Sequence, residues 1–221
     1  MKRADLYNYS NGARFVGKTA KEVFTEIEKE NVWIEEETKS GIGSSILQTK
    51  KIVEQIPKVL SDLNIKSIFD IPCGDFNWFQ KIDLTGKVYC GGDIVEKIIT
   101  HNNSKYKKDN INFIVFNLLE EIPANYDLIF CRDCLVHFSY ADIEKALYNI
   151  KKSGSKYFIT TTFPEEESNE NIITGGWRPI DLTKEPFNFP QPIMIINEDC
   201  TEMDGRFSDK SLGIWEIKTL R

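Results

Sequence analysis

The chain has 221 residues, of which 41% are hydrophobic and 28% are charged, values typical of a soluble globular protein. Its net charge of −6 gives no support to nucleic-acid binding, which usually requires a basic face. The polar N-terminal residues lack the apolar segment of a signal peptide, and no stretch of about 18 apolar residues predicts a membrane span. We therefore expect a cytoplasmic protein, monomeric or homodimeric, that binds neither nucleic acid nor membranes.

The cysteines predict neither a disulfide framework nor a metal site. The five cysteines are scattered along the chain, which is typical of a reducing compartment. Cys131 and Cys134 form a C-x-x-C motif, but no second pair of ligands with zinc spacing accompanies it. No cluster of histidine and carboxylate residues has ligand spacing either, so we predict that no metal takes part.

Helical periodicity dominates the N-terminal part of the chain. Apolar residues at helical spacing predict a short amphipathic helix over 20–29. The polar segment SGIGSS, over 40–45, precedes a second apolar helical face over 46–63, which Pro57 is expected to kink or split. We interpret residues 1–64 as a helical cap that contributes to an active site.

The spacing of apolar residues changes after residue 64, where short apolar runs bounded by turn residues predict strands. The predicted strands cover 67–71, 87–90, 112–116, 126–131, 156–163, 193–196 and 212–220. Helices are predicted between them over 94–101 and 140–151. This alternation is typical of an α/β domain, here 65–221, with a mostly parallel sheet and helices on both faces. The last two strands could form a terminal antiparallel pair.

A long irregular insertion, 165–192, follows the fifth predicted strand and is rich in glycine and proline. Loops longer than about 15 residues in compact domains are usually functional or disordered, and the aromatic residues here argue against disorder. We interpret this insertion as an acceptor lid, in which Trp177 and Arg178 would clamp a small anionic or sugar substrate. The aromatic rings could equally anchor the insertion on the sheet.

Acidic residues follow the first two strands of the predicted sheet, where α/β proteins bind ligands. Asp70 ends the first strand and can accept a hydrogen bond from an ammonium group, and Gly74 allows close approach of the backbone. Asp93 comes 93 − 70 = 23 residues later, where a carboxylate can hold the ribose hydroxyls of an adenosine. Asn117, after the third strand, can bind an adenine edge. Asp70, Asp93 and Asn117 could instead be an ordinary cap, turn and loop residue.

The first turn, D-I-P-C-G-D-F, favours a sulfonium nucleoside over a dinucleotide. A nicotinamide dinucleotide site would require G-x-G-x-x-G, so that the pyrophosphate lies at a helix N-terminus. This turn has a single glycine and two acidic residues. S-Adenosylmethionine carries no phosphate, and its cationic sulfonium suits an acidic turn.

The order and spacing of these motifs resemble the class I S-adenosylmethionine-dependent methyltransferases over 67–163. The whole pattern, with its lid GGWRPIDLTKEPFNFPQP, looks most like the small bacterial enzymes of surface-glycan or capsule modification. Asp70, Cys73 and Gly74 match the family's first motif, whereas Pro72 and Phe76 stand where glycines are common. The resemblance implies a three-layer, Rossmann-like sheet of seven strands, with S-adenosylmethionine as methyl donor and S-adenosylhomocysteine as product. The predicted donor-binding residues are Asp70, Cys73, Gly74, Asp75, Trp78, Asp93, Ile94, Asn117, Leu118 and Arg132.

Candidate residues for catalysis lie in the loop after the fourth predicted strand. His137 could remove the proton of an acceptor hydroxyl, although a structural, helix-capping role is also open. Asp133 shares this loop and could act as a base, orient His137 or bind an acceptor cation. Ser44 and Ser45 could bind an anion at a helix start, or simply cap that helix.

The leading hypothesis is methyl transfer to a small-molecule acceptor, such as a hydroxyl of a sugar, a sugar nucleotide or a phosphate-bearing metabolite. A nicotinamide-dependent Rossmann oxidoreductase is the main alternative, and the single-glycine turn disfavours it. A non-catalytic binding module is disfavoured because acids follow both of the first two strands. A nucleic-acid methyltransferase is disfavoured by the negative net charge.

Overall fold

The computed structural model describes residues 12–33 and 36–220 and shows a seven-stranded sheet. The strands are β1 (Ser67–Asp70), β2 (Val88–Asp93), β3 (Ile111–Val115), β4 (Leu128–Cys131), β5 (Tyr157–Thr162), β6 (Met194–Asn197) and β7 (Ser211–Glu216). Their order is β3-β2-β1-β4-β5-β7-β6, and β7 runs antiparallel to both of its neighbours. The predicted α/β fold with an antiparallel terminal pair is confirmed.

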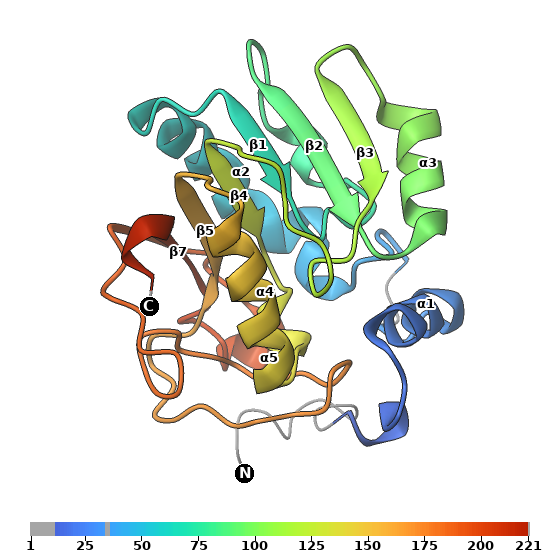
Figure 1. Cartoon of the computed structure of the whole chain (residues 1–221), viewed down its shortest axis with the longest axis vertical. Helices are drawn as coiled ribbons and strands as arrows, with labels where there is room; N and C mark the ends of the chain where they lie inside the picture. The colour runs from blue at the N-terminus through green and yellow to red at the C-terminus, as the bar shows by residue number, and fades with distance from the viewer. Residues whose placement is uncertain (1–11, 34–35, 221) are drawn as a thin grey trace.

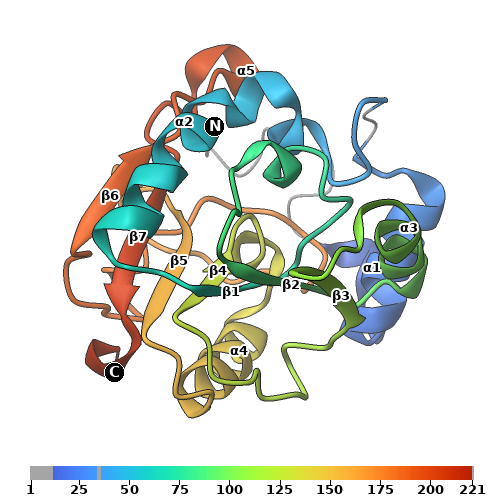
Figure 2. The same cartoon turned by 90° about the horizontal axis from the view of Figure 1, so that it is seen from above.

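Helices cover both faces of this sheet. They are α1 (Ala20–Glu30), α2 (Ile46–Asp62), α3 (Glu96–Tyr106), α4 (Tyr140–Lys152) and the short α5 (Glu202–Gly205). Figure 1 shows α4 in front of the sheet and α2 behind it, and the view from above in Figure 2 places these two helices on opposite faces. The insertion between β5 and β6 contains no helix or strand.

Local sequence signals explain where the first helices begin. The Thr19 side chain accepts from the backbone N–H of Glu22, whose carboxylate accepts from the N–H of Thr19, a reciprocal capping box that starts α1. Ser45 caps α2 by accepting from the N–H of Gln48. Pro57 lies inside one continuous helix, so of the two expected outcomes, a kink or a split, the split does not occur.

Two hydrophobic cores lie on opposite faces of the sheet, because successive strand residues point to opposite sides. In β1, Ile68 packs into the core beneath α2, whereas Phe69 packs into the core beneath α4. The same alternation divides Ile129 from Phe130 in β4. Strands buried on both faces explain the continuous apolar runs of the sequence.

The connection from β1 to β2 differs from the usual strand–helix–strand unit. It contains only a three-residue 3₁₀ turn, Phe79–Lys81, and no α-helix begins at the turn that follows β1. Phe76 has φ 59°, the left-handed conformation that glycine adopts most easily. Its ring is buried among Tyr89, Tyr106 and Phe113, so this residue combines a glycine-like backbone with an aromatic core contact.

Candidate functional site

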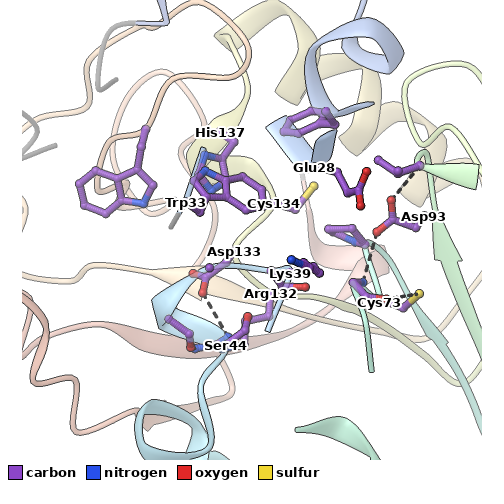
Figure 3. A pocket seen from close by; sticks show the side chains of 18 of the residues that line it. Glu28, Trp33, Lys39, Ser44, Cys73, Asp93, Arg132, Asp133, Cys134 and His137 are labelled. Carbon is purple, nitrogen blue, oxygen red and sulfur yellow. Dashed lines mark hydrogen bonds and ion pairs between the residues drawn. The ribbon is translucent and has the colours of Figure 1, made fainter. Parts of the chain in front are cut away.

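A cavity of about 690 Å³ opens at the carboxyl ends of β1, β2 and β4, where the strand order reverses. Its volume lies within the range of about 300–1,000 Å³ that is usual for small-molecule sites. The cap closes the other side, with residues 12–14, parts of α1 and the loop 39–44 lining the cavity. In the view of Figure 3, Asp93 and Cys73 lie at one side and His137 and Trp33 at the other.

The turn after β1 packs tightly against the cap loop. Gly74 has φ 53°, and a Cβ at this position would lie 2.1 Å from Oγ of Ser40. The Asp75 carboxylate accepts hydrogen bonds from the Thr38 hydroxyl at 3.0 Å and from the Lys39 backbone N–H at 2.8 Å. The predicted donor turn therefore also holds the cap loop in place, and Asp75 has a structural task that sequence reasoning did not foresee.

Replacing Gly74 with alanine is expected to lower the free energy of unfolding by about 1–3 kcal/mol more than the same change at Gly86. Both glycines have positive φ, but nothing lies within 4 Å of a Cβ at Gly86. Gly86→Ala is therefore the control, because it introduces the backbone strain without the clash against Ser40. Urea denaturation of the two variants measures the difference, and equal losses would contradict close packing of the cap loop on this turn.

Asp70 and Asp93 are buried in the cavity wall, and burial raises the pKa of both carboxyls, to about 8 for Asp70 and about 6 for Asp93. Asp70 accepts a hydrogen bond of 2.6 Å from the Tyr89 hydroxyl. Asp93 accepts from the N–H groups of Gly74 and Val95. Neither forms an ion pair with any lysine or arginine in the described part of the chain, so a cation or a hydrogen-bond donor of a ligand would compensate for their burial.

The other predicted donor residues also line this cavity. They are Cys73, Trp78, Ile94, Asn117, Leu118 and Arg132. Asn117 uses its side-chain oxygen to accept from the N–H of Leu119, which leaves its amide NH₂ available as a donor. Trp78 serves the fold as well, because its ring packs against Phe130.

His137 lines the cavity and is only 9% exposed. Burial lowers its pKa to about 4, so the imidazole is neutral at pH 7. Its Nδ1 lies 2.7 Å from the carbonyl oxygen of Gly176. A carbonyl oxygen only accepts, so Nδ1 carries the proton and Nε2 keeps a free lone pair. This is the tautomer that a general base requires.

Asp133, the second predicted catalytic residue, is held between two cations. Its carboxylate lies 2.8 Å from Nζ of Lys210 and 3.2 Å from the guanidinium of Arg132. These charges hold its pKa well below the usual range for a carboxyl group. The expectation that Asp133 acts as a base, or binds an acceptor cation, does not fit this arrangement.

Arg132 is the centre of a buried charge network. Its guanidinium donates to both carboxylate oxygens of Glu198, with a closest distance of 2.6 Å, and to the carbonyl oxygen of Gly43 at 2.8 Å. Lys210 also approaches Glu198, at 3.9 Å. A Cβ at Gly43 would lie 3.2 Å from Nζ of Lys210, so the glycine allows the cap loop to approach the network closely.

The four predicted acceptor residues divide into two groups. Ser44 and Trp177 line the cavity, and their part in acceptor binding stays a prediction. Ser45 is not among the lining residues and acts as the cap of α2. Arg178 does not line it either, and the expectation that it binds an anionic acceptor does not fit its contacts. Its side chain is 1% exposed and donates to three backbone carbonyls, those of Leu135, Phe138 and Glu170, fixing the insertion on the loop after β4.

Sequence reasoning missed several cavity residues that come from the cap and from the C-terminal part of the chain. Trp33 packs on His137 with ring centroids 5.2 Å apart, and Phe24 contacts the same imidazole edge-on at 6.5 Å. The one sequence signal that could have marked Trp33 as a cavity residue is its position as a lone tryptophan in a charged segment. Lys39, Glu202 and Lys210 also line the cavity, and no motif marked them.

Within residues 12–33 and 36–220, no group of three or more histidine, cysteine, aspartate or glutamate side chains could hold a metal ion. None of the helices described has both the length and the apolar character needed to cross a membrane.

Solved methyltransferase structures share this fold. Searches by sequence found no matching family model and no matching curated relative. The methyltransferase domain of bacterial CtHen1-C is similar at a TM-score of 0.55 and 14% identity, over 78% of this chain and 98% of that domain. Magnesium protoporphyrin IX methyltransferase from Synechocystis PCC 6803, crystallised with bound S-adenosylhomocysteine, matches at 0.50 and 13%, over 66% and 74% of the two chains. At such low identity the similarity establishes the Rossmann-like fold.

Proposed function

We propose that this protein transfers a methyl group from S-adenosylmethionine to a hydroxyl of a small molecule. The observation that carries the proposal is a single cavity that joins the acidic turn after β1 and Asp93 at the end of β2 to a buried, neutral His137 after β4. A donor bound along the turn after β1 and Asp93 would present its methyl group toward His137. The methyltransferase structures of the same fold support this function.

The chemistry of the donor half suits S-adenosylmethionine. Its sulfonium supplies a methyl group that is already activated for displacement, so the protein mainly has to align the reactants. Asp70 would bind the cationic end of the donor, and a positive charge beside it would lower the raised pKa of its carboxyl. Asp93 would accept from the ribose hydroxyls, and Asn117 and Leu118 would contact the adenine.

His137 would act as the general base. Its unprotonated Nε2 would accept the acceptor's hydroxyl proton as the oxygen attacks the methyl carbon, while Nδ1–H stays bonded to Gly176. Burial of His137 and the packing of Trp33 on its ring limit its exposure to water. Asp133, ion-paired to Lys210, would instead stabilise the loop that carries His137.

The acceptor half favours an uncharged hydroxyl compound such as a sugar. Trp33, Trp177 and Phe24 supply apolar faces there, whereas the guanidinium of Arg178, the cation expected to bind an anionic acceptor, is bonded to backbone carbonyls of the loop after β4 and of Glu170. This lining supports a sugar more than a phosphate-bearing metabolite. Surface-glycan modification in the cytoplasm, suggested by the sequence resemblance, is compatible with such an acceptor and forms part of the proposal.

The β1–β2 connection argues against the nicotinamide alternative. Dinucleotide sites place the pyrophosphate at the N-terminus of a helix that follows the first strand. Here β1 is followed by an acidic turn and a three-residue 3₁₀ turn, so the backbone supplies no helical N–H groups at that point.

Calorimetric titration with S-adenosylhomocysteine and with NAD tests the donor. We expect binding of S-adenosylhomocysteine alone, and an increase in its dissociation constant of about 10-fold or more in Asp93→Asn, because a charged acceptor of the ribose hydroxyls is lost. Affinity should also fall as pH is lowered through about 6, where Asp93 takes up a proton. Binding of NAD without S-adenosylhomocysteine would overturn the proposal.

A further inference from the structure

One cation that lines the cavity, the ammonium group of Lys39, has no role in the reaction proposed above. Four lysine and arginine residues line it in the described part of the chain: Arg14, Lys39, Arg132 and Lys210. Arg132 and Lys210 are ion-paired with Glu198 and Asp133.

Arg14 is also paired, through its guanidinium, with Glu26 and Glu30 of α1. The Lys39 ammonium, by contrast, forms no ion pair with any residue in 12–33 or 36–220, although its side chain lines the cavity. In the view of Figure 3, Lys39 lies between Arg132 and Cys73.

The backbone of Lys39 is fixed beside the donor turn. Its N–H donates to one Asp75 carboxylate oxygen, and the neighbouring Thr38 hydroxyl donates to the other. The backbone N–H of Asp75 donates in return to Oγ of Ser40, at 3.3 Å. These three bonds join the loop and the turn, so the side chain of Lys39 starts from a defined position next to Gly74.

The charges around the turn define what Lys39 would bind. Asp70, Asp75 and Asp93 give this end of the cavity an acidic character that suits the ammonium and sulfonium of the donor but repels its carboxylate. A bound amino-acid group therefore needs a separate cation at its carboxylate end. We propose that Lys39 is the carboxylate-binding residue of the donor site and that Asp75 holds it in place; this inference rests on the proposed methyl donor.

The test compares two ligands that differ only in this group: S-adenosylhomocysteine and its decarboxylated form, which keeps the amine. In Lys39→Met the dissociation constant of S-adenosylhomocysteine should rise about tenfold, while that of the decarboxylated ligand should stay within about twofold of wild type. Lys50→Met is the matched control, because Lys50 is exposed on α2 and does not line the cavity. It should leave both dissociation constants unchanged.

Three outcomes would overturn the assignment. Unchanged affinity of Lys39→Met for S-adenosylhomocysteine would remove Lys39 from the donor site and leave it to an anionic acceptor. An equal loss for both ligands would show that the substitution disturbs the loop rather than removing a charge partner. Wild-type protein that binds neither ligand would remove the proposed function itself, a result distinct from the first two, in which the wild type binds S-adenosylhomocysteine.

Discussion

Replacement of His137 with asparagine should lower kcat about 10²- to 10⁴-fold and leave the affinity for S-adenosylhomocysteine unchanged. Asparagine can still donate an N–H to the carbonyl oxygen of Gly176, so the local structure is preserved while the basic nitrogen is lost. Single-turnover rates and calorimetry on the same samples separate chemistry from donor binding. Retained kcat in this variant would exclude His137 as the base.

The pH profile provides a second measurement of the same role. A base whose pKa is lowered to about 4 is unprotonated throughout the neutral range, so kcat should show no inflection near pH 6.5 and should fall only as pH approaches 4. His101, the other histidine of the chain, is exposed on α3. His101→Asn is therefore the control and should leave kcat unchanged, whereas an inflection near pH 6.5 in wild type would contradict the burial of His137.

Replacement of Arg132 with methionine should lower the free energy of unfolding by about 3–5 kcal/mol, because a buried carboxylate loses its main partner. Glu198 is 2% exposed, and the Arg132 guanidinium binds both of its oxygens. Lys210 would remain as the nearest cation, at 3.9 Å. Urea denaturation near pH 7 measures this loss, and a loss below about 1 kcal/mol would contradict the proposed role of the pair.

The double variant Arg132→Met, Glu198→Leu is the matched control for this prediction. Removing both charges leaves no unpaired carboxylate in the core, so the double variant should be more stable than Arg132→Met alone. If the double variant is as unstable as the sum of the two single variants, the two residues are not energetically coupled. Packing of the Arg132 guanidinium on Trp78 would then explain the loss better than charge does.

The sheet could be predicted from sequence because its determinants are local. A strand buried on both faces produces a short apolar run, as in 67–71, and such runs predicted the strands to within a few residues. The C-terminal half of α3 was missed because its sequence, Asn102–Tyr106, has little apolar periodicity. Asn102 is nevertheless fully buried, since its side chain donates to the carbonyl oxygen of Gly74.

The site was predictable only where function depends on position along a strand. Asp70 and Asp93 end their strands and His137 lies in the loop after β4, and the topology brings them to one cavity. The proposed acceptor half depends on contacts between distant segments, which no local pattern encodes. Arg178 has the chemistry of an anion-binding residue, but in the folded chain its guanidinium donates hydrogen bonds to three backbone carbonyls instead.

Residues 13–33 have a small core of their own, formed by Phe15, Val23 and Ile27, and Phe24 joins it to the core beneath α4. One exposed ion pair, Lys97 with Glu28, links α1 to α3, and exposed pairs contribute little stability. Because this core is small, local opening of residues 13–33 should cost less free energy than unfolding of the sheet. Such an opening would part Phe24 and Trp33 from His137 and let ligands exchange, while β1–β5 and the positions of Asp70 and Asp93 stay unchanged.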